Sequence, residues 1–265
     1  MTEPNLLALL LEKTPNIDRV CEIFDTDLIP EAVKDLNSDF SPRRLTKLPR
    51  LTEPLPTDKR QLSSYRTRMG TILEYALSTK IQAILDHRYD RKLLLTFAVA
   101  HEYPDFYLRD AELVPKLRIE MKAVDADSDE QAARFDVPTA SINPSRDLIL
   151  FIGWEWKDSV EPAGEYPNIF AYIVIPAAEI AKERDKRLYA IGGNITDGAV
   201  LVPSTKKQGK MVPDPGNYGK LLRIIGKQRR GVTELSEHMR RFEAFLRTVD
   251  EHTVRRGARK RARFK

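Results

Sequence analysis

The middle of the chain holds acidic and basic residues with the spacing of a metal-assisted hydrolytic site. Pro104 and Asp105 are followed, after fourteen residues, by Glu120, Met121 and Lys122. Two carboxylates supply the hard oxygen ligands that Mg²⁺ prefers. A neighbouring lysine can orient a water molecule and stabilise developing negative charge. This combination suits phosphodiester hydrolysis, in which the cation lowers the pKa of a bound water.

The residues around Glu120 alternate as in a strand. In residues 116–124, KLRIEMKAV, every second side chain is apolar. Because side chains on a strand alternate between its two faces, Glu120 and Lys122 are predicted to project together, with Ile119 and Met121 facing the core. Residues 103–110 form a second candidate strand, and pairing of the two strands would bring Asp105 to the same sheet edge.

The remaining elements predict an α/β protein with a mixed central β-sheet flanked by helices, and helical N- and C-terminal additions. A long helix is expected over 61–87, with Glu74 in its middle. Residues 5–40 favour short helices, and 41–60, with four prolines and six bases, an extended connector. Further strands are expected over 92–100, 147–156, 169–175, 187–191 and 199–203, the last two around a turn at 192–198. Further helices are expected over 126–136, 176–187 and 233–251.

This order of elements over residues 60–155 resembles the core of the PD-(D/E)XK nucleases, and of type II restriction endonucleases among them. The resemblance implies a restriction-endonuclease-like fold in which Asp105 and Glu120 bind Mg²⁺, Lys122 is catalytic, and Glu74 is the additional catalytic glutamate of many members. It also implies a prokaryotic homodimer that cuts double-stranded DNA at a specific short sequence. We expect one nuclease domain over 1–265, comprising an arm (1–60), a catalytic core (61–156) and a segment (157–265) that extends the sheet and carries DNA-recognition and basic C-terminal parts.

Other residues compete for these roles. Asp110 lies nearer to Glu120 along the chain than Asp105 does and is an alternative ligand. Glu155 and Lys157 form a second ExK at the end of an apolar strand, and His101 lies close to Asp105. Asp105 also fits a turn after proline, and Glu120 and Lys122 also fit a solvent-facing pair on a half-exposed strand.

Positive charge is concentrated towards the C-terminus. Residues 1–40 have nine acids and three bases, whereas residues 204–265 have eighteen bases and six acids. Such polarity suits a protein with one face on a polyanion. The predicted DNA-binding residues are Lys206, Lys207, Gln208, Lys210, Asn217, Lys220, Arg223, Lys227, Arg229 and Arg230, although this segment also fits a solvated basic loop. The tail 255–265, with seven bases, favours nonspecific phosphate contacts.

Composition narrows the remaining possibilities. A single cysteine, Cys21, excludes an intramolecular disulfide and fits a reducing cytoplasm. The four histidines are scattered, so a bound metal is expected to be a hard ion held by carboxylates. No apolar run reaches the roughly 20 residues of a membrane span, and we expect no membrane association. Three other functions fit the sequence: a structure-specific, DNA-repair or nicking endonuclease of the same core, a non-catalytic basic nucleic-acid-binding protein, and a metal-independent structural subunit.

Overall fold

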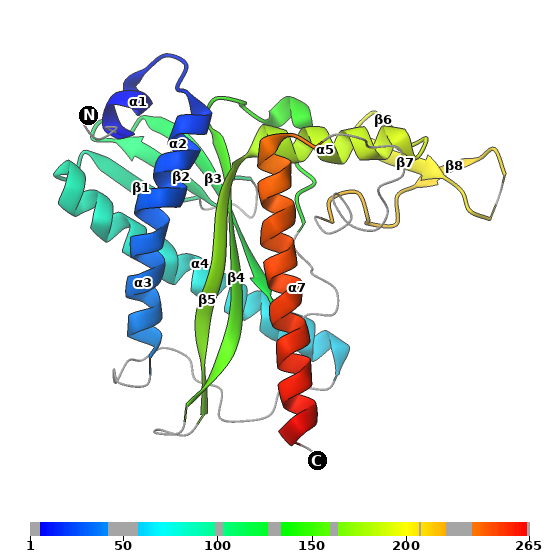
Figure 1. Cartoon of the computed structure of the whole chain (residues 1–265). Helices are drawn as coiled ribbons and strands as arrows, with labels where there is room; N and C mark the ends of the chain where they lie inside the picture. Colours follow the sequence, from blue (N-terminus) through cyan, green and yellow to red (C-terminus); the bar gives the residue numbers. More distant parts are fainter. Residues whose placement is uncertain are drawn as a thin grey trace.

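A five-stranded mixed sheet forms the centre of the molecule (Figure 1). The computed structural model describes residues 6–41, 58–98, 103–126, 134–159, 164–206, 208–220 and 235–263. The strands are β1 (Leu93–Phe97), β2 (Phe106–Asp110), β3 (Pro115–Asp125), β4 (Asp147–Ser159) and β5 (Gly164–Pro176), and they lie side by side in chain order. Only β3 and β4 are parallel, while the other neighbouring pairs are antiparallel.

One face of the sheet is covered by the helices that precede β1 in the chain. This layer contains α1 (Leu6–Leu11), α2 (Ile17–Ile23), a short π-helix η1 (Phe24–Leu28), α3 (Ile29–Phe40) and α4 (Lys59–Tyr89). Helix α4 begins after Asp58, whose side chain accepts a hydrogen bond from the Gln61 backbone N–H at 2.9 Å. Its buried residues recur at helical spacing and pack against the sheet, which fixes the rotation of the helix and therefore the direction of its polar side chains. They are Met69, Leu73, Leu77, Ile81, Ile84 and Leu85.

The opposite face packs against α5 (Ala177–Ala190) and α7 (Glu237–Arg263). Helix α7 lies across β4 and β5 from α3 (Figure 1). Phe151 of β4 meets Phe242 of α7 with ring centroids 4.6 Å apart. Gly153 permits the close approach, because a Cβ there would lie only 3.0 Å from the Val249 side chain. The sheet is thus the middle of three layers, with an apolar core on each side.

A small three-stranded sheet projects from the body (Figure 1). It consists of β6 (Asn194–Thr196), β7 (Ala199–Pro203) and β8 (Met211–Pro213), all antiparallel. A 3-10 turn, η2 (Thr139–Ser141), lies in the connection between the parallel strands β3 and β4. Among the residues described, no helix has the length and apolar character needed to cross a membrane.

The predicted α/β class, with a mixed sheet flanked by helices, is confirmed, but three predicted elements are wrong where the structure describes them. The turn expected over 192–198 contains the strand β6. Residues 187–191 were expected as a strand, yet α5 continues to Ala190 and buries Leu188. Residues 134–136 of the expected helix 126–136 are not helical: Arg134 forms a β-bridge with Lys220, and the Phe135 N–H donates to the Gly219 carbonyl. Residues 127–133, and 42–57 of the expected connector, lie outside the described residues.

Candidate active site

The candidate site lies where β2 stops pairing with β3. Their last pair is Phe106 opposite Ile119, whereas β3 continues beside β4 as far as Asp125. Two backbone N–H groups of β3 beyond that point are capped by carboxylates. The Met121 N–H donates to Asp105 Oδ2 at 2.8 Å, and the Ala123 N–H donates to the Glu74 carboxylate. Because β2 begins only at Phe106, β3 has an open edge beyond Ile119 that two acids fill.

Glu120 and Lys122 meet at this edge. Lys122 Nζ donates to Glu120 Oε1 at 2.5 Å. The lysine side chain is 21% exposed and the glutamate side chain 10%. Ile119 and Met121, which alternate with them, are buried in the core beneath α4. The predicted alternation is thus confirmed, and the predicted solvent-facing alternative does not describe Glu120, which is almost completely buried.

Glu74 reaches the site from the middle of α4. Burial, together with the negative charge of Asp105, raises its pKa from 4.5 to about 8; Lys122 and the Ala123 N–H oppose this, and Glu120 adds to it. The structure therefore brings together all four side chains that the sequence singled out, from α4, the start of β2, and β3.

The charges within this group are tightly interdependent. Burial raises the pKa of Glu120, and Lys122 only partly offsets this. Burial disfavours the charged form of Lys122 too, but the Glu120, Asp105 and Glu74 carboxylates outweigh it and raise the lysine pKa. Lys122 is therefore a cation at neutral pH. Three acids share one ammonium, so the group has capacity for a further positive charge.

The donor set fits a hard divalent cation. The Asp105 backbone N–H lies close enough to the Glu120 carboxylate to favour its charged form. Glu120 Oε2 is nevertheless buried and accepts no hydrogen bond of ordinary geometry within the described residues. Such an atom is costly to bury unless a ligand satisfies it. Within the same residues, no group of three or more His, Cys, Asp and Glu side chains has an arrangement that could hold a metal ion.

An apolar pocket of about 380 Å³ adjoins the acids. Its wall includes Glu74 and Asp105, and its remaining side chains are mainly apolar or aromatic. Tyr75 and Phe97 are 63% and 60% exposed there, and Phe97 packs edge-on against Phe106 with ring centroids 5.6 Å apart. Sequence reasoning missed these rings, although Tyr75 directly follows Glu74 in the chain.

The competing acids lie elsewhere. Asp110 is at the far end of β2, where it pairs with Lys116 at 2.7 Å and accepts a hydrogen bond from the Val114 N–H, an arrangement that holds the β2–β3 turn. Its pKa is lowered, mainly by the hydrogen bond from Lys116. Glu155 faces α7, where its carboxylate lies 3.4 Å from His252. His101 lies outside the described residues.

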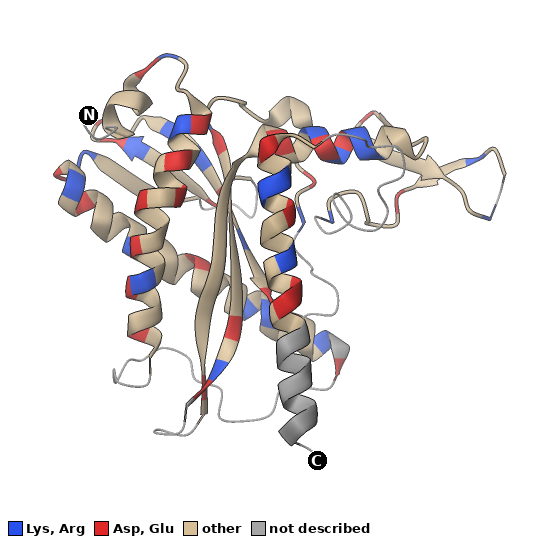
Figure 2. Cartoon of the chain, in the orientation of Figure 1, with Lys and Arg blue, Asp and Glu red and all other residues tan. Residues whose placement is uncertain are grey.

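The predicted DNA-binding residues fall into three groups. Lys206, Gln208 and Lys210 are exposed in the turn between β7 and β8, where Figure 2 shows positive charge on the projecting hairpin. Asn217 and Lys220 are partly buried; the Asn217 N–H donates to Asp214 Oδ2 at 2.5 Å. The remaining five lie outside the described residues: Lys207, Arg223, Lys227, Arg229 and Arg230.

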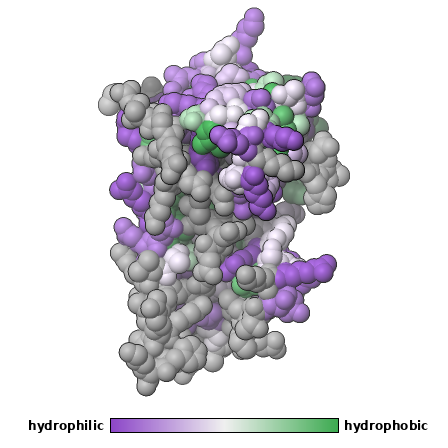
Figure 3. All heavy atoms as spheres, turned by 90° about the vertical axis from the view of Figure 1, so that its right-hand side faces the viewer, coloured by the Kyte–Doolittle hydropathy of each residue, from purple (hydrophilic) through white to green (hydrophobic). Residues whose placement is uncertain are grey.

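The face of the molecule that carries this hairpin is largely hydrophilic where it is described (Figure 3). The backbone of the basic tail continues α7 as far as Arg263. Lys206 and Lys210 are thus presented on a different element from the acids, whereas Lys122 lies among the acids. This separation suits a protein whose phosphate contacts and chemistry involve different elements.

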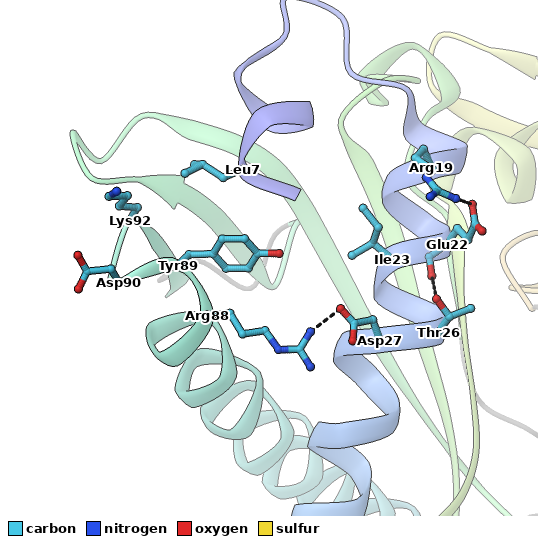
Figure 4. A pocket seen from close by; sticks show the side chains of 10 residues that line it. All are labelled: Leu7, Arg19, Glu22, Ile23, Thr26, Asp27, Arg88, Tyr89, Asp90 and Lys92. Carbon is cyan, nitrogen blue, oxygen red and sulfur yellow. Dashed lines mark hydrogen bonds and ion pairs between the residues drawn. The ribbon is translucent and has the colours of Figure 1, made fainter. Parts of the chain in front are cut away.

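A second and larger pocket, of about 770 Å³, lies between α2, the end of α4 and the start of β1 (Figure 4). Its charged residues are largely paired with one another: Arg88 binds Asp27 and Glu31, and Arg19 binds Glu22. The Arg88 pairs link α4 to η1 and α3, whereas the Arg19 pair lies within α2, and we interpret all of them as structural.

Comparison with known proteins adds no assignment, because no family model and no curated protein matches the chain.

Proposed function

We propose that this protein is a type II restriction endonuclease that uses Mg²⁺ to hydrolyse phosphodiester bonds at a specific short sequence in double-stranded DNA. The observation that carries the proposal is the convergence of Glu74, Asp105, Glu120 and Lys122 at one sheet edge. The order of α4, β1, β2 and β3 agrees with the PD-(D/E)XK resemblance. The restriction-endonuclease-like fold, the homodimer and a cytoplasmic setting belong to the same proposal.

Asp105 and Glu120 would hold the cation. When bound, the cation would lower the pKa of a water molecule and offset negative charge on the phosphate under attack. The buried Glu120 Oε2 and the upward-shifted pKa of Glu74 both indicate a group that is short of positive charge. Mg²⁺ fits because both ligands are hard carboxylate oxygens.

Lys122 supplies a fixed positive charge. Its ammonium remains protonated at neutral pH, so it acts as a hydrogen-bond donor to a phosphate oxygen or to the attacking water rather than as a base. Glu120 orients the Lys122 ammonium through the 2.5 Å hydrogen bond. Because the lysine side chain is shielded from water, its positive charge acts more strongly on nearby groups.

Glu74 is the side chain best suited to proton transfer. Its pKa is about 8 without a metal, and a cation bound at Asp105 and Glu120 would lower that pKa towards neutral pH, where a general acid or base works best. The hydrogen bond from the Ala123 N–H fixes its position at the edge, and the long helix that carries it is anchored by core packing.

The experiment that tests the proposal is incubation of phage DNA with the protein, with and without Mg²⁺, followed by sequencing of the fragment ends. Sharp bands that appear only with Mg²⁺ and share one end sequence are expected. Nicks or smears with Mg²⁺ would instead indicate a structure-specific or repair endonuclease, and DNA binding without any cleavage would indicate a non-catalytic protein.

Asp105→Asn gives the matched test of the site, because it removes one carboxylate charge while keeping a side chain of the same shape. Asp110→Asn is its control, since Asp105 directly precedes β2 whereas Asp110 ends that strand and pairs with Lys116. Cleavage should be lost only in Asp105→Asn, with DNA binding retained. Equal loss in both variants would contradict the assignment.

A further inference from the structure

The pocket beside the acids has a composition unlike the rest of the candidate site. Its lining includes the acids Glu74 and Asp105 together with the apolar or aromatic side chains of Ile72, Tyr75 and Phe97. These three are exposed large hydrophobic residues, at 38%, 63% and 60%. Clusters of exposed apolar side chains beside a polar site generally indicate a surface that binds something.

The rings are held in a defined arrangement. Tyr75 lies edge-on to Phe97 with centroids 6.5 Å apart, and Phe97 lies edge-on to the buried Phe106 with centroids 5.6 Å apart. Phe106 begins β2 directly after Asp105, and Tyr75 directly follows Glu74 on α4. The elements that position the acids therefore also position the aromatic surface.

We propose that this pocket takes one unstacked nucleobase of the substrate strand, next to the phosphate being cleaved. This inference rests on the proposed function. A phosphate at Asp105 and Glu120 brings its own nucleotide and the next within reach of the adjoining pocket wall. The occupant must therefore carry phosphate at one end and a flat group with apolar faces at the other. A nucleotide meets both requirements, and aromatic side chains bind bases by stacking without a hydrogen-bond code.

Tyr75 and Phe97 are then specificity-determining residues that favour a substrate whose base leaves the stack. A base in a duplex must first be unpaired and unstacked, which a mismatched or single-stranded base avoids. The pocket volume of about 380 Å³ falls within the range typical of small-molecule and base-sized sites.

The test compares two fluorescently labelled polymers, a 20-nucleotide oligothymidylate and an abasic phosphodiester of equal length, with Ca²⁺ replacing Mg²⁺. Both carry the same phosphates, but only the first has bases. Binding is measured by fluorescence anisotropy for the wild type and for the double variant Tyr75→Leu/Phe97→Leu, which keeps apolar side chains but removes both rings. Tyr189→Leu is the control, because Tyr189 is also exposed, at 56%, but lies on α5.

The wild type and Tyr189→Leu should bind oligothymidylate roughly tenfold more tightly than the abasic polymer, since stacking on one aromatic side chain is worth about 1–3 kcal/mol. The double variant should bind both polymers equally. Equal binding by the wild type, or a preference retained in the double variant, would overturn the inference. The inference would also be overturned if light scattering showed a changed oligomeric state for the double variant while its preference for oligothymidylate stayed the same.

Failure of this inference is distinguishable from failure of the proposed function. A wild type that cuts phage DNA with Mg²⁺ but has no preference for bases refutes the pocket alone. A wild type that prefers bases but never cuts DNA supports the pocket and refutes the nuclease.

Discussion

Glu74→Gln should stabilise the metal-free protein, and increasingly so as pH rises. The Glu74 pKa is about 8 in the folded chain against an ordinary value of 4.5. The folded state therefore holds this proton more tightly than the unfolded state does. Wild-type stability should fall as pH rises from about 4.5 to about 8 and level off above that, because the unfolded chain ionises first. Glutamine remains neutral and can still accept the hydrogen bond from the Ala123 N–H.

The magnitude follows from the two pKa values. A pKa difference of one corresponds to about 1.4 kcal/mol, so the difference of roughly 3.5 gives on the order of 5 kcal/mol above pH 8 and about 3 kcal/mol at pH 7. These figures are upper bounds, because Glu74 is only partly buried and water reduces the penalty. Below pH 4.5 the variant and the wild type should have similar stability, since both side chains are neutral there.

The assay is urea unfolding at pH 4.5, 7 and 8.5 in the presence of EDTA, followed by the fluorescence of the buried Trp154 and Trp156. Glu112→Gln, in the exposed β2–β3 turn, is the control that should show no such trend. Adding Mg²⁺ should narrow the gap between Glu74→Gln and the wild type. Stability curves that stay parallel across pH, or a variant less stable than the wild type at pH 8.5, would refute the electrostatic argument.

Three further outcomes are expected. Lys122→Met should slow DNA cleavage by roughly a hundredfold or more, whereas Lys157→Met, in the second ExK, should leave the rate unchanged. Equal slowing of both variants in a cleavage assay would contradict the assignment. The double variant Lys206→Gln/Lys210→Gln should weaken DNA binding to the same extent for every DNA sequence. It should also reduce the slope of log affinity against log salt concentration by about 2. An unchanged slope in a salt titration would exclude the hairpin from the DNA interface. Arg184→Met should destabilise the fold by about 3 kcal/mol, measured by urea unfolding, because the buried guanidinium donates to two backbone carbonyls that would lose their partner; a change below about 1 kcal/mol would show those carbonyls to be satisfied otherwise.

The sequence was most informative where periodicity and burial coincide. The alternation around Ile119 and Met121 correctly predicted β3, and helical spacing correctly predicted α4 to within two residues at each end. Both are long elements with one face on the core, so their pattern depends on local spacing alone. Glu120 and Lys122 project together for the same reason.

The errors occur where distant parts of the chain decide the structure. Residues 134–136 were expected to be helical, but Phe135 and Arg134 pair with residues 219 and 220, a partnership that no local pattern reveals. The apolar pattern at 187–191 fits a strand or a helix end equally, and packing of Leu188 favours the helix. The roles assigned to the site residues remain predictions, because chemistry does not follow from convergence alone.

The capping of the Met121 and Ala123 N–H groups was likewise invisible in the sequence. It depends on the point at which β2 leaves β3, and that point follows from pairing between strands rather than from either strand by itself. For the same reason the sequence did not indicate that Tyr75 and Phe97 share a pocket with the acids.

The most direct measurement of the central idea is an anomalous difference map from crystals of the protein soaked in Mn²⁺, a heavier substitute for Mg²⁺. We expect the strongest peak within bonding distance of both the Asp105 and Glu120 carboxylates, and its loss in Asp105→Asn crystals. A strongest peak at any other acids, or one that persists in the variant, would contradict the account.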